Sequence, residues 1–235
     1  MSSNSEVSYG ARVGNAEKLV AALQNFNNYT PIKPEYSITA YNDLITAVKS
    51  QNNDVASKKQ SYSLAVEKRK QVYDLKINAI NKLLSPINAA VKVSFGRTAK
   101  EATDVAGIIA KIRGANIKNK KTANPDEATV SQSYQSFNSK AQFFADLIAN
   151  LSNFGTNYTP VNSEITIAEL NNRYNDAITA NNDVMNNFTQ FVQNNKVRIE
   201  TYNTLSKIGI RIKDSIKAQY GNNSTEYNLI KGLKI

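Results

Sequence analysis

The stretch that decides the fold is SITAYNDLITAVKSQNNDVASKKQSYSLAVEKRKQVYDLKINAINKLLSPINAAVKVSF, residues 37–95. It contains no glycine, and its only proline is Pro86. Apolar and aromatic side chains return at steps of three, four or seven residues, which places one stripe along an α-helix rather than on alternate faces of a strand. The stripe consists of Val55, Tyr62, Val66, Tyr73, Ile77, Ile80, Leu84, Ile87 and Val91. The stretch therefore predicts one long amphipathic helix.

A second stretch, residues 166–220, repeats this pattern. Three groups of residues recur at a common offset of about 129 positions. They are Asn28-Tyr29-Thr30-Pro31 with Asn157-Tyr158-Thr159-Pro160, Asn52-Asn53-Asp54-Val55 with Asn181-Asn182-Asp183-Val184, and Arg69 and Tyr73 with Arg198 and Tyr202. This agreement predicts an internal duplication of the chain.

Toward the end of the two stretches the offset falls to about 125, which aligns Lys92, Phe95 and Gly96 with Lys217, Tyr220 and Gly221. A change of four residues is close to one helical turn, so we expect both stretches to stay helical with their stripes in phase. Proline and glycine weaken a helix interior. We therefore predict a kink or a break at Pro86 and at the nearly matching Gly209.

These features predict an all-α fold with an elongated, four-helix-bundle-like architecture built from two tandem helical repeats. The long helices, about 37–95 and 166–220, are expected to run antiparallel, because neither can bury its apolar stripe alone. Repeat 1 is assigned to residues 1–113, a basic linker to 114–125 and repeat 2 to 126–235.

Shorter helices are expected to complete each repeat. They cover residues 15–26, about 126–154, the stretch from Thr98 to Arg113, and a short tail helix from about Ser224. Residues 1–11 are Ser-rich and are expected to be loosely held. The expected helix boundaries are an N-cap at Ser37, capping boxes at Thr166 with Glu169 and at Thr98 with Glu101, and a C-terminal stop at Gly114.

The composition excludes most familiar chemistry. The chain has no cysteine and no histidine, which removes the usual zinc sites, Ser-His-Asp and Cys-His catalysis, and di-iron sites built on Glu-x-x-His pairs. Carboxylates such as Glu67, Asp74, Glu200 and Asp214 are scattered, and no phosphate-binding loop is present. We therefore predict a protein that is not an enzyme, with no catalytic, cofactor or metal-binding residues.

The net charge of +10 is unevenly distributed, because residues 1–121 carry 19 basic and 9 acidic side chains while residues 122–235 carry 10 of each. One half of the chain is thus suited to meet an acidic partner, and drift together with solubility is the alternative explanation of the asymmetry. The candidate anion-contacting residues are Lys58, Lys59, Lys68, Arg69, Lys70, Lys111, Arg113, Lys118, Lys120 and Lys121.

Three paired features carry a resemblance. They are Arg-x-x-x-Tyr at Arg69 and Arg198, Lys-x-x-Phe/Tyr-Gly at Lys92 and Lys217, and a Ser/Thr-rich entry to a short helix at Thr98 and Ser224. With these features the chain resembles a group of uncharacterised bacterial all-helical proteins. The resemblance spans most of the chain and implies the helical fold, without an activity.

The sequence predicts a non-catalytic structural or protein-interaction role, in which the partner is another protein or a second copy of this chain. One alternative is an anionic-surface binder that holds nucleic acid or an acidic membrane through the basic first half. A second is a helical membrane-active toxin. The N-terminus has no signal-peptide pattern and no apolar run approaches a membrane span, so we expect a cytoplasmic protein, with non-classical export left open.

Overall fold

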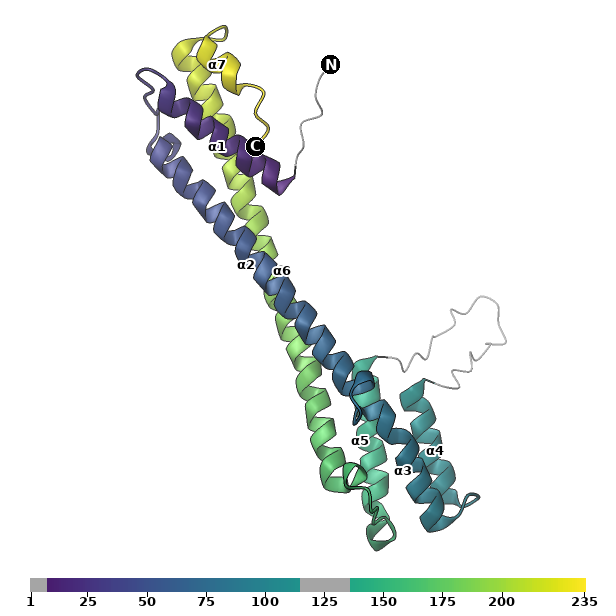
Figure 1. Cartoon of the computed structure of the whole chain (residues 1–235). Helices are drawn as coiled ribbons and strands as arrows, with labels where there is room; N and C mark the ends of the chain where they lie inside the picture. Colours follow the sequence, from purple (N-terminus) through teal and green to yellow (C-terminus); the bar gives the residue numbers. More distant parts are fainter. Residues whose placement is uncertain (1–7, 115–135) are drawn as a thin grey trace, which may run out of the picture. The chain divides into compact units, whose positions relative to one another are not determined.

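The structure of the protein is a computed structural model that describes residues 8–114 and 136–235. Within these residues the chain forms α-helices, short 3-10 segments and one π-helical segment, and no strand (Figure 1). The predicted all-α class is therefore confirmed. Apart from Gly114, the predicted linker 114–125 lies outside the described residues.

The chain divides into two compact units, each of which combines segments that are distant in sequence. Unit 1 contains residues 1–60 and 188–235, and unit 2 contains residues 61–187. Helices α2 (Ile38–Lys70) and α6 (Ile167–Tyr220) contribute one part to each unit. Each unit therefore takes segments from both predicted repeats, whereas the predicted domain boundary separates the repeats along the sequence.

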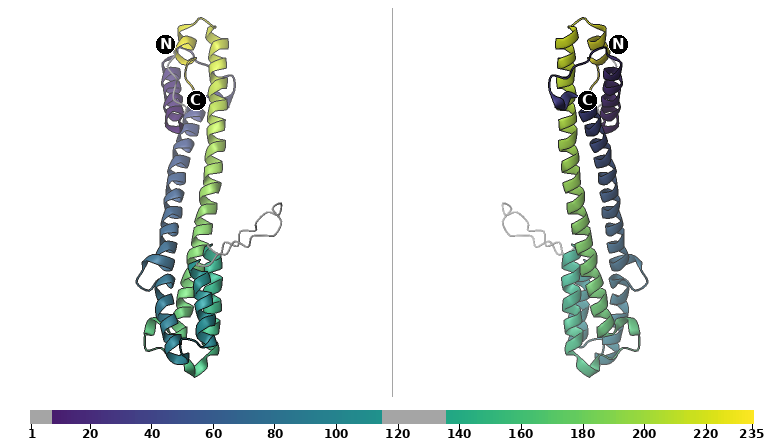
Figure 2. Two further views of the ribbon diagram at one scale, coloured as in Figure 1. Left: turned by 90° about the vertical axis from the view of Figure 1, so that its right-hand side faces the viewer. Right: turned by 90° about the vertical axis from the view of Figure 1, so that its left-hand side faces the viewer.

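Unit 1 packs α1 (Tyr9–Asn25) and α7 (Thr225–Ile230) against the first part of α2 and the last part of α6 (Figures 1 and 2). Its core contains Leu19, Leu23, Tyr41, Ile45, Val48, Leu205, Ile212, Ile216 and Ile230. Within unit 1, residues later in α2 contact residues earlier in α6, as expected for antiparallel helices. The Tyr41 hydroxyl donates to the Leu205 carbonyl at 3.3 Å, and Lys58 donates to Gln190 at 3.0 Å.

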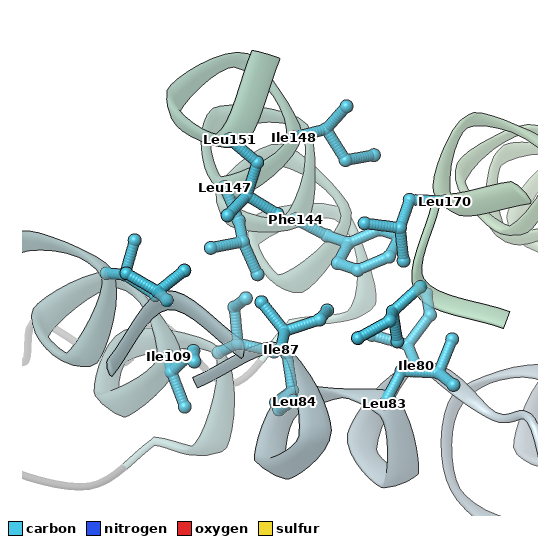
Figure 3. Packing of buried hydrophobic residues seen from close by; sticks show 14 of the residues in the cluster. Ile80, Leu83, Leu84, Ile87, Ile109, Phe144, Leu147, Ile148, Leu151 and Leu170 are labelled. Carbon is cyan, nitrogen blue, oxygen red and sulfur yellow. The ribbon is translucent and has the colours of Figure 1, made fainter. Parts of the chain in front are cut away.

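Unit 2 packs four further elements around the end of α2 and the first part of α6. These elements are the π-helical segment Gln71–Leu75, α3 (Ile80–Phe95), α4 (Lys100–Arg113) and α5 (Phe137–Asn153). Figure 3 shows the core, in which Ile80, Leu83, Leu84 and Ile87 of α3 meet Ile109 of α4, Leu170 of α6, and Phe144, Leu147, Ile148 and Leu151 of α5.

The predicted continuous helix from residue 37 to residue 95 is wrong in one place, because the chain leaves the helix at Lys76–Ala79. Neither helix is broken at the residue where we predicted a kink or a break, and a kink there stays a prediction. Helix α3 continues through Pro86, and α6 continues through Gly209. Gly209 serves packing instead: a Cβ atom there would lie 2.6 Å from the Tyr41 hydroxyl oxygen.

The excursion at Lys76–Ala79 accounts for the change of offset between the two stretches. Seven positions separate Tyr73 from Ile80, whereas three separate the matching Tyr202 from Leu205. The sequence predicts that the four additional residues form one more helical turn, but in the structure they do not. They form the excursion, in which the Ile77 side chain is 95% exposed.

Several predicted helix boundaries are confirmed. The Ser37 hydroxyl accepts from the Ala40 amide at 3.2 Å, and the Thr166 hydroxyl accepts from the Glu169 amide at 3.4 Å. The second half of the predicted Thr166 capping box does not form, because the Glu169 carboxylate binds Asn172 and Arg173 instead. Gly114 ends α4 with a φ of 69°, in the left-handed region that favours glycine. The tail helix is also confirmed, with the Ser224 side chain as its N-cap.

Other boundaries differ from the prediction. Helix α1 begins at Tyr9 with Ser8 as its N-cap, so residues 9–14 are helical although residues 1–11 were expected to be loosely held. Helix α4 follows Ala99 and has no side-chain cap, so the predicted Thr98 capping box is wrong. Helix α5 starts at Phe137 and has Ser136 as its N-cap. Residues 126–135 of the predicted helix 126–154 lie outside the described residues.

Candidate functional site

A polar cluster in unit 2 joins three helical segments around the buried Tyr73 side chain. The Tyr73 hydroxyl donates to the Phe137 carbonyl at 2.9 Å and accepts from the Asn181 side chain at 3.0 Å. The Arg69 guanidinium lies over the Phe137 ring, 4.0 Å from its centroid. Burial raises the pKa of Tyr73, so this hydroxyl stays a neutral hydrogen-bonding group.

Unit 1 contains a cluster of the same kind around the buried Tyr202 side chain. The Tyr202 hydroxyl donates to the Tyr9 carbonyl at 3.0 Å and accepts from the Asn52 side chain at 2.8 Å. The Arg198 guanidinium lies 4.4 Å from the centroid of the Tyr9 ring. The Arg, Tyr and Asn members of the two clusters stand at positions that the sequence offset pairs, whereas the fourth member is Phe137 in one cluster and Tyr9 in the other. The contacts of both clusters position helices rather than offer a reactive group.

Several of the predicted anion-contacting residues that the structure describes already have partners within their own unit. Lys68 pairs with Asp183 at 2.9 Å, and Arg69 is stacked on Phe137. The remaining contacts are Lys58 to Gln190 at 3.0 Å, Lys111 to the Phe143 ring at 5.5 Å and Arg113 to Ser85 at 2.7 Å. Lys59 and Lys70 are exposed and make no such contact with the described residues. Lys118, Lys120 and Lys121 lie outside the described residues.

Residues 8–114 and 136–235 contain no group of three or more acidic side chains placed to hold a metal ion. One lysine is electrostatically unusual: burial lowers the pKa of Lys213, whose ammonium group donates to the Leu233 carbonyl at 2.9 Å. This bond ties the C-terminal segment to α6. In the part of the chain that is described, no helix combines the length and apolar character needed to cross a bilayer.

Helix α6 carries an exposed apolar stripe, which we define as Ile178, Met185, Val192 and Ile199. These residues are spaced by seven positions and are 36%, 63%, 47% and 42% exposed. They lie beside the buried face of α6 rather than on it. A seven-residue apolar repeat is the pattern by which one helix packs along another. Sequence analysis did not identify this stripe, because only burial in the structure separates these residues from the apolar residues of the core.

An apolar groove of about 340 Å³ lies in unit 2 between α3 and the loop 155–165. Its walls include Pro86, Ala90 and Val93 from α3 and Tyr158, Thr159, Pro160 and Val161 from the loop. The Val93 side chain is 87% exposed. A polar hollow of about 290 Å³ adjoins the groove on α3 and is lined by Ser85, Asn88, Lys92 and Arg97.

No known protein family, curated protein or solved structure matches this chain. The resemblance to uncharacterised bacterial helical proteins and the internal duplication therefore stay predictions. Two surfaces of the protein bear on its function, namely the exposed stripe of α6 and the groove of unit 2.

Proposed function

We propose that this protein is a non-catalytic structural protein that associates with copies of itself through the exposed apolar stripe of α6. The seven-residue spacing of Ile178, Met185, Val192 and Ile199 carries this proposal. Large apolar side chains that recur in register on one helix indicate an interaction surface when they stay in contact with water.

A second copy of the chain is the partner that the stripe fits best. Packing along a heptad stripe requires a helix with the same periodicity, and every copy presents such a helix. The chain carries a net charge of +10, so two copies repel one another in general. A contact between copies therefore has to use an uncharged surface, and all members of the stripe are uncharged.

The proposal is tested by light scattering coupled to size-exclusion chromatography over a range of protein concentrations. The wild-type chain is expected to form an oligomer as its concentration rises, and Val192→Asp is expected to stay monomeric. The matched control is Val197→Asp, because Val197 is 46% exposed on the same helix. It lies about 140° around the helix from Val192, so this variant should associate like the wild type.

Two outcomes contradict the proposal. One is a wild-type chain that stays monomeric at every concentration, and the other is an equal loss of association in both variants. The same measurement at low and high salt with added nucleic acid or anionic vesicles tests the charge-driven alternative. A monomer that binds either additive only at low salt supports that alternative over self-association.

A further inference from the structure

In unit 1 the loop that precedes α2 is bound by a side-chain amide from α6. The Gln219 carboxamide accepts from the Thr30 amide at 3.3 Å and donates to the Asn28 carbonyl at 2.6 Å. Gln219 thus supplies the two functions of an amide, an acceptor oxygen and a donor nitrogen, to exposed backbone groups of the loop.

The matching loop in unit 2 has a similar fold but lacks this amide. Tyr158 donates to the Ile165 carbonyl at 2.8 Å, as Tyr29 donates to the Tyr36 carbonyl at 2.8 Å. The backbone amide of Thr159, which matches Thr30, has no hydrogen-bond partner among the described residues.

The residue that corresponds to Gln219 is Ser94. The residues that follow Ser94 and Gln219 make similar contacts, which supports this assignment. The ring centroids of Phe95 and Phe154 are 4.8 Å apart, and those of Tyr220 and Phe26 are 5.9 Å apart. The Ser94 side chain carries no amide and lines the apolar groove together with Thr159. Thr159, which lines the groove, therefore carries a backbone donor without a described partner, whereas the matching donor of Thr30 in unit 1 is bound by Gln219.

The surroundings of the groove define what else an occupant has to offer. Val93 and Val161 are 87% and 104% exposed, so an apolar side chain of a partner would remove both from water. Lys92 and Arg97 line the adjoining hollow, and residues 80–97 contain no acidic side chain. An occupant that extends from the groove along α3 thus meets positive charge.

We propose that the groove of unit 2 binds an extended peptide segment of a partner protein. The segment places an Asn or Gln carboxamide on the Thr159 amide, an apolar side chain between Val93 and Val161, and an acidic side chain near Lys92 and Arg97. Peptide recognition commonly combines a few backbone hydrogen bonds with pockets for particular side chains. This contact is separate from self-association through α6 and does not rest on it.

The test uses the full chain and a displayed library of random heptapeptides. Selection on the wild type is compared with selection on Ser94→Gln, which places a carboxamide where Gln219 stands in unit 1. The wild type should enrich peptides that contain Asn or Gln beside an apolar and an acidic residue. The enriched peptide should shift the NMR signals of the Thr159 and Val93 amides, and Ser94→Gln should bind it at least tenfold more weakly.

Controls separate blocking of the groove from general effects of substitution. Ser63→Gln makes the same change at an exposed position of α2 outside the groove and should bind like the wild type. Val192→Asp should also keep peptide binding, which distinguishes this site from the stripe. The proposal is overturned if wild type and Ser94→Gln enrich the same peptides, if nothing enriched shifts Thr159, or if the enriched peptides match segments of this chain.

Discussion

The side-chain amide of Asn181 donates a hydrogen bond of 3.0 Å to the hydroxyl of Tyr73. In unit 1, Asn52 makes the same bond to Tyr202 at 2.8 Å. The two pairs stand about 129 positions apart in sequence, and each joins α2 or its continuation to α6. The two contacts are thus related by the same offset on which the predicted duplication rests.

Removing either buried tyrosine hydroxyl should destabilise the protein by a similar amount. Tyr73→Phe and Tyr202→Phe each remove one hydrogen bond from an Asn amide and one to a backbone carbonyl, so we expect the free energy of unfolding to fall by about 1–2 kcal/mol. Urea denaturation measures this change. Tyr174→Phe is the control, because the Tyr174 hydroxyl makes no hydrogen bond with the described residues. An equal loss in that variant would contradict the role of the clusters.

Gly209→Ala should destabilise the protein even though alanine is the better helix former. The new Cβ would meet the Tyr41 hydroxyl oxygen at 2.6 Å and Ile235 at 3.0 Å. Overpacking of this kind costs about 1–3 kcal/mol, more than the ~1 kcal/mol gained in helix propensity. Gly107→Ala in α4 meets nothing within 4 Å and should raise the melting temperature. A change of stability in the same direction in both variants would contradict this role of Gly209.

Stability should fall at alkaline pH as the buried tyrosines are forced to ionise. Burial raises the pKa of Tyr29 and of Tyr158 to about 12 from an ordinary value of 10.0. The folded state therefore keeps protons that the unfolded state releases, and this contribution is complete below pH 10 and lost as the pH rises toward 12. Denaturation at several pH values measures this loss of stability, and the absorbance of tyrosinate shows the pH at which the tyrosines ionise. Tyr158→Phe should flatten part of the decline.

Two neighbouring cations at the end of α2 should contribute unequally to stability. Lys68 pairs with Asp183 at an exposed position, so Lys68→Ala should cost less than ~0.5 kcal/mol, and high salt should remove this effect. Arg69 is half-buried over the Phe137 ring, so Arg69→Ala should cost about 1–2 kcal/mol at any salt concentration. Chemical denaturation at low and high salt separates the two, and equal salt dependence would contradict this assignment.

The apolar periodicity of residues 37–95 and 166–220 was sufficient to predict the helices, because burial of one side chain every three or four residues leaves a pattern in the sequence. Local hydrogen bonding at Ser37, Thr166 and Gly114 was equally visible, since capping depends on residues within one turn.

Features that depend on tertiary contacts were not predictable in this way. Pro86 stays within α3, whose buried face packs against α4 and α5. Gly209 is explained by Tyr41, which is distant in sequence. The excursion at Lys76–Ala79 contains neither glycine nor proline, the residues that would predict a helix break there.

For the candidate sites too, the sequence identified the residue types, while their partners depend on contacts with other parts of the fold. Charge counting selected Lys68 and Arg69, but whether a cation is paired or stacked depends on Asp183 and Phe137 from other helices. The stripe on α6 was present in the sequence, yet only burial separates exposed from buried apolar residues. The groove depends on Thr159, whose missing partner is a property of three-dimensional packing.

The discontinuity of unit 1 has a consequence for the order in which a nascent chain folds. Unit 2 is a single run of sequence, residues 61–187, and has all its segments once that run has left the ribosome. Unit 1 joins residues 1–60 to 188–235, so its first helices are synthesised long before their partners. During translation α1 and the start of α2 therefore expose apolar faces, and chaperones that bind such faces are expected to engage them until residues 188–235 have been synthesised.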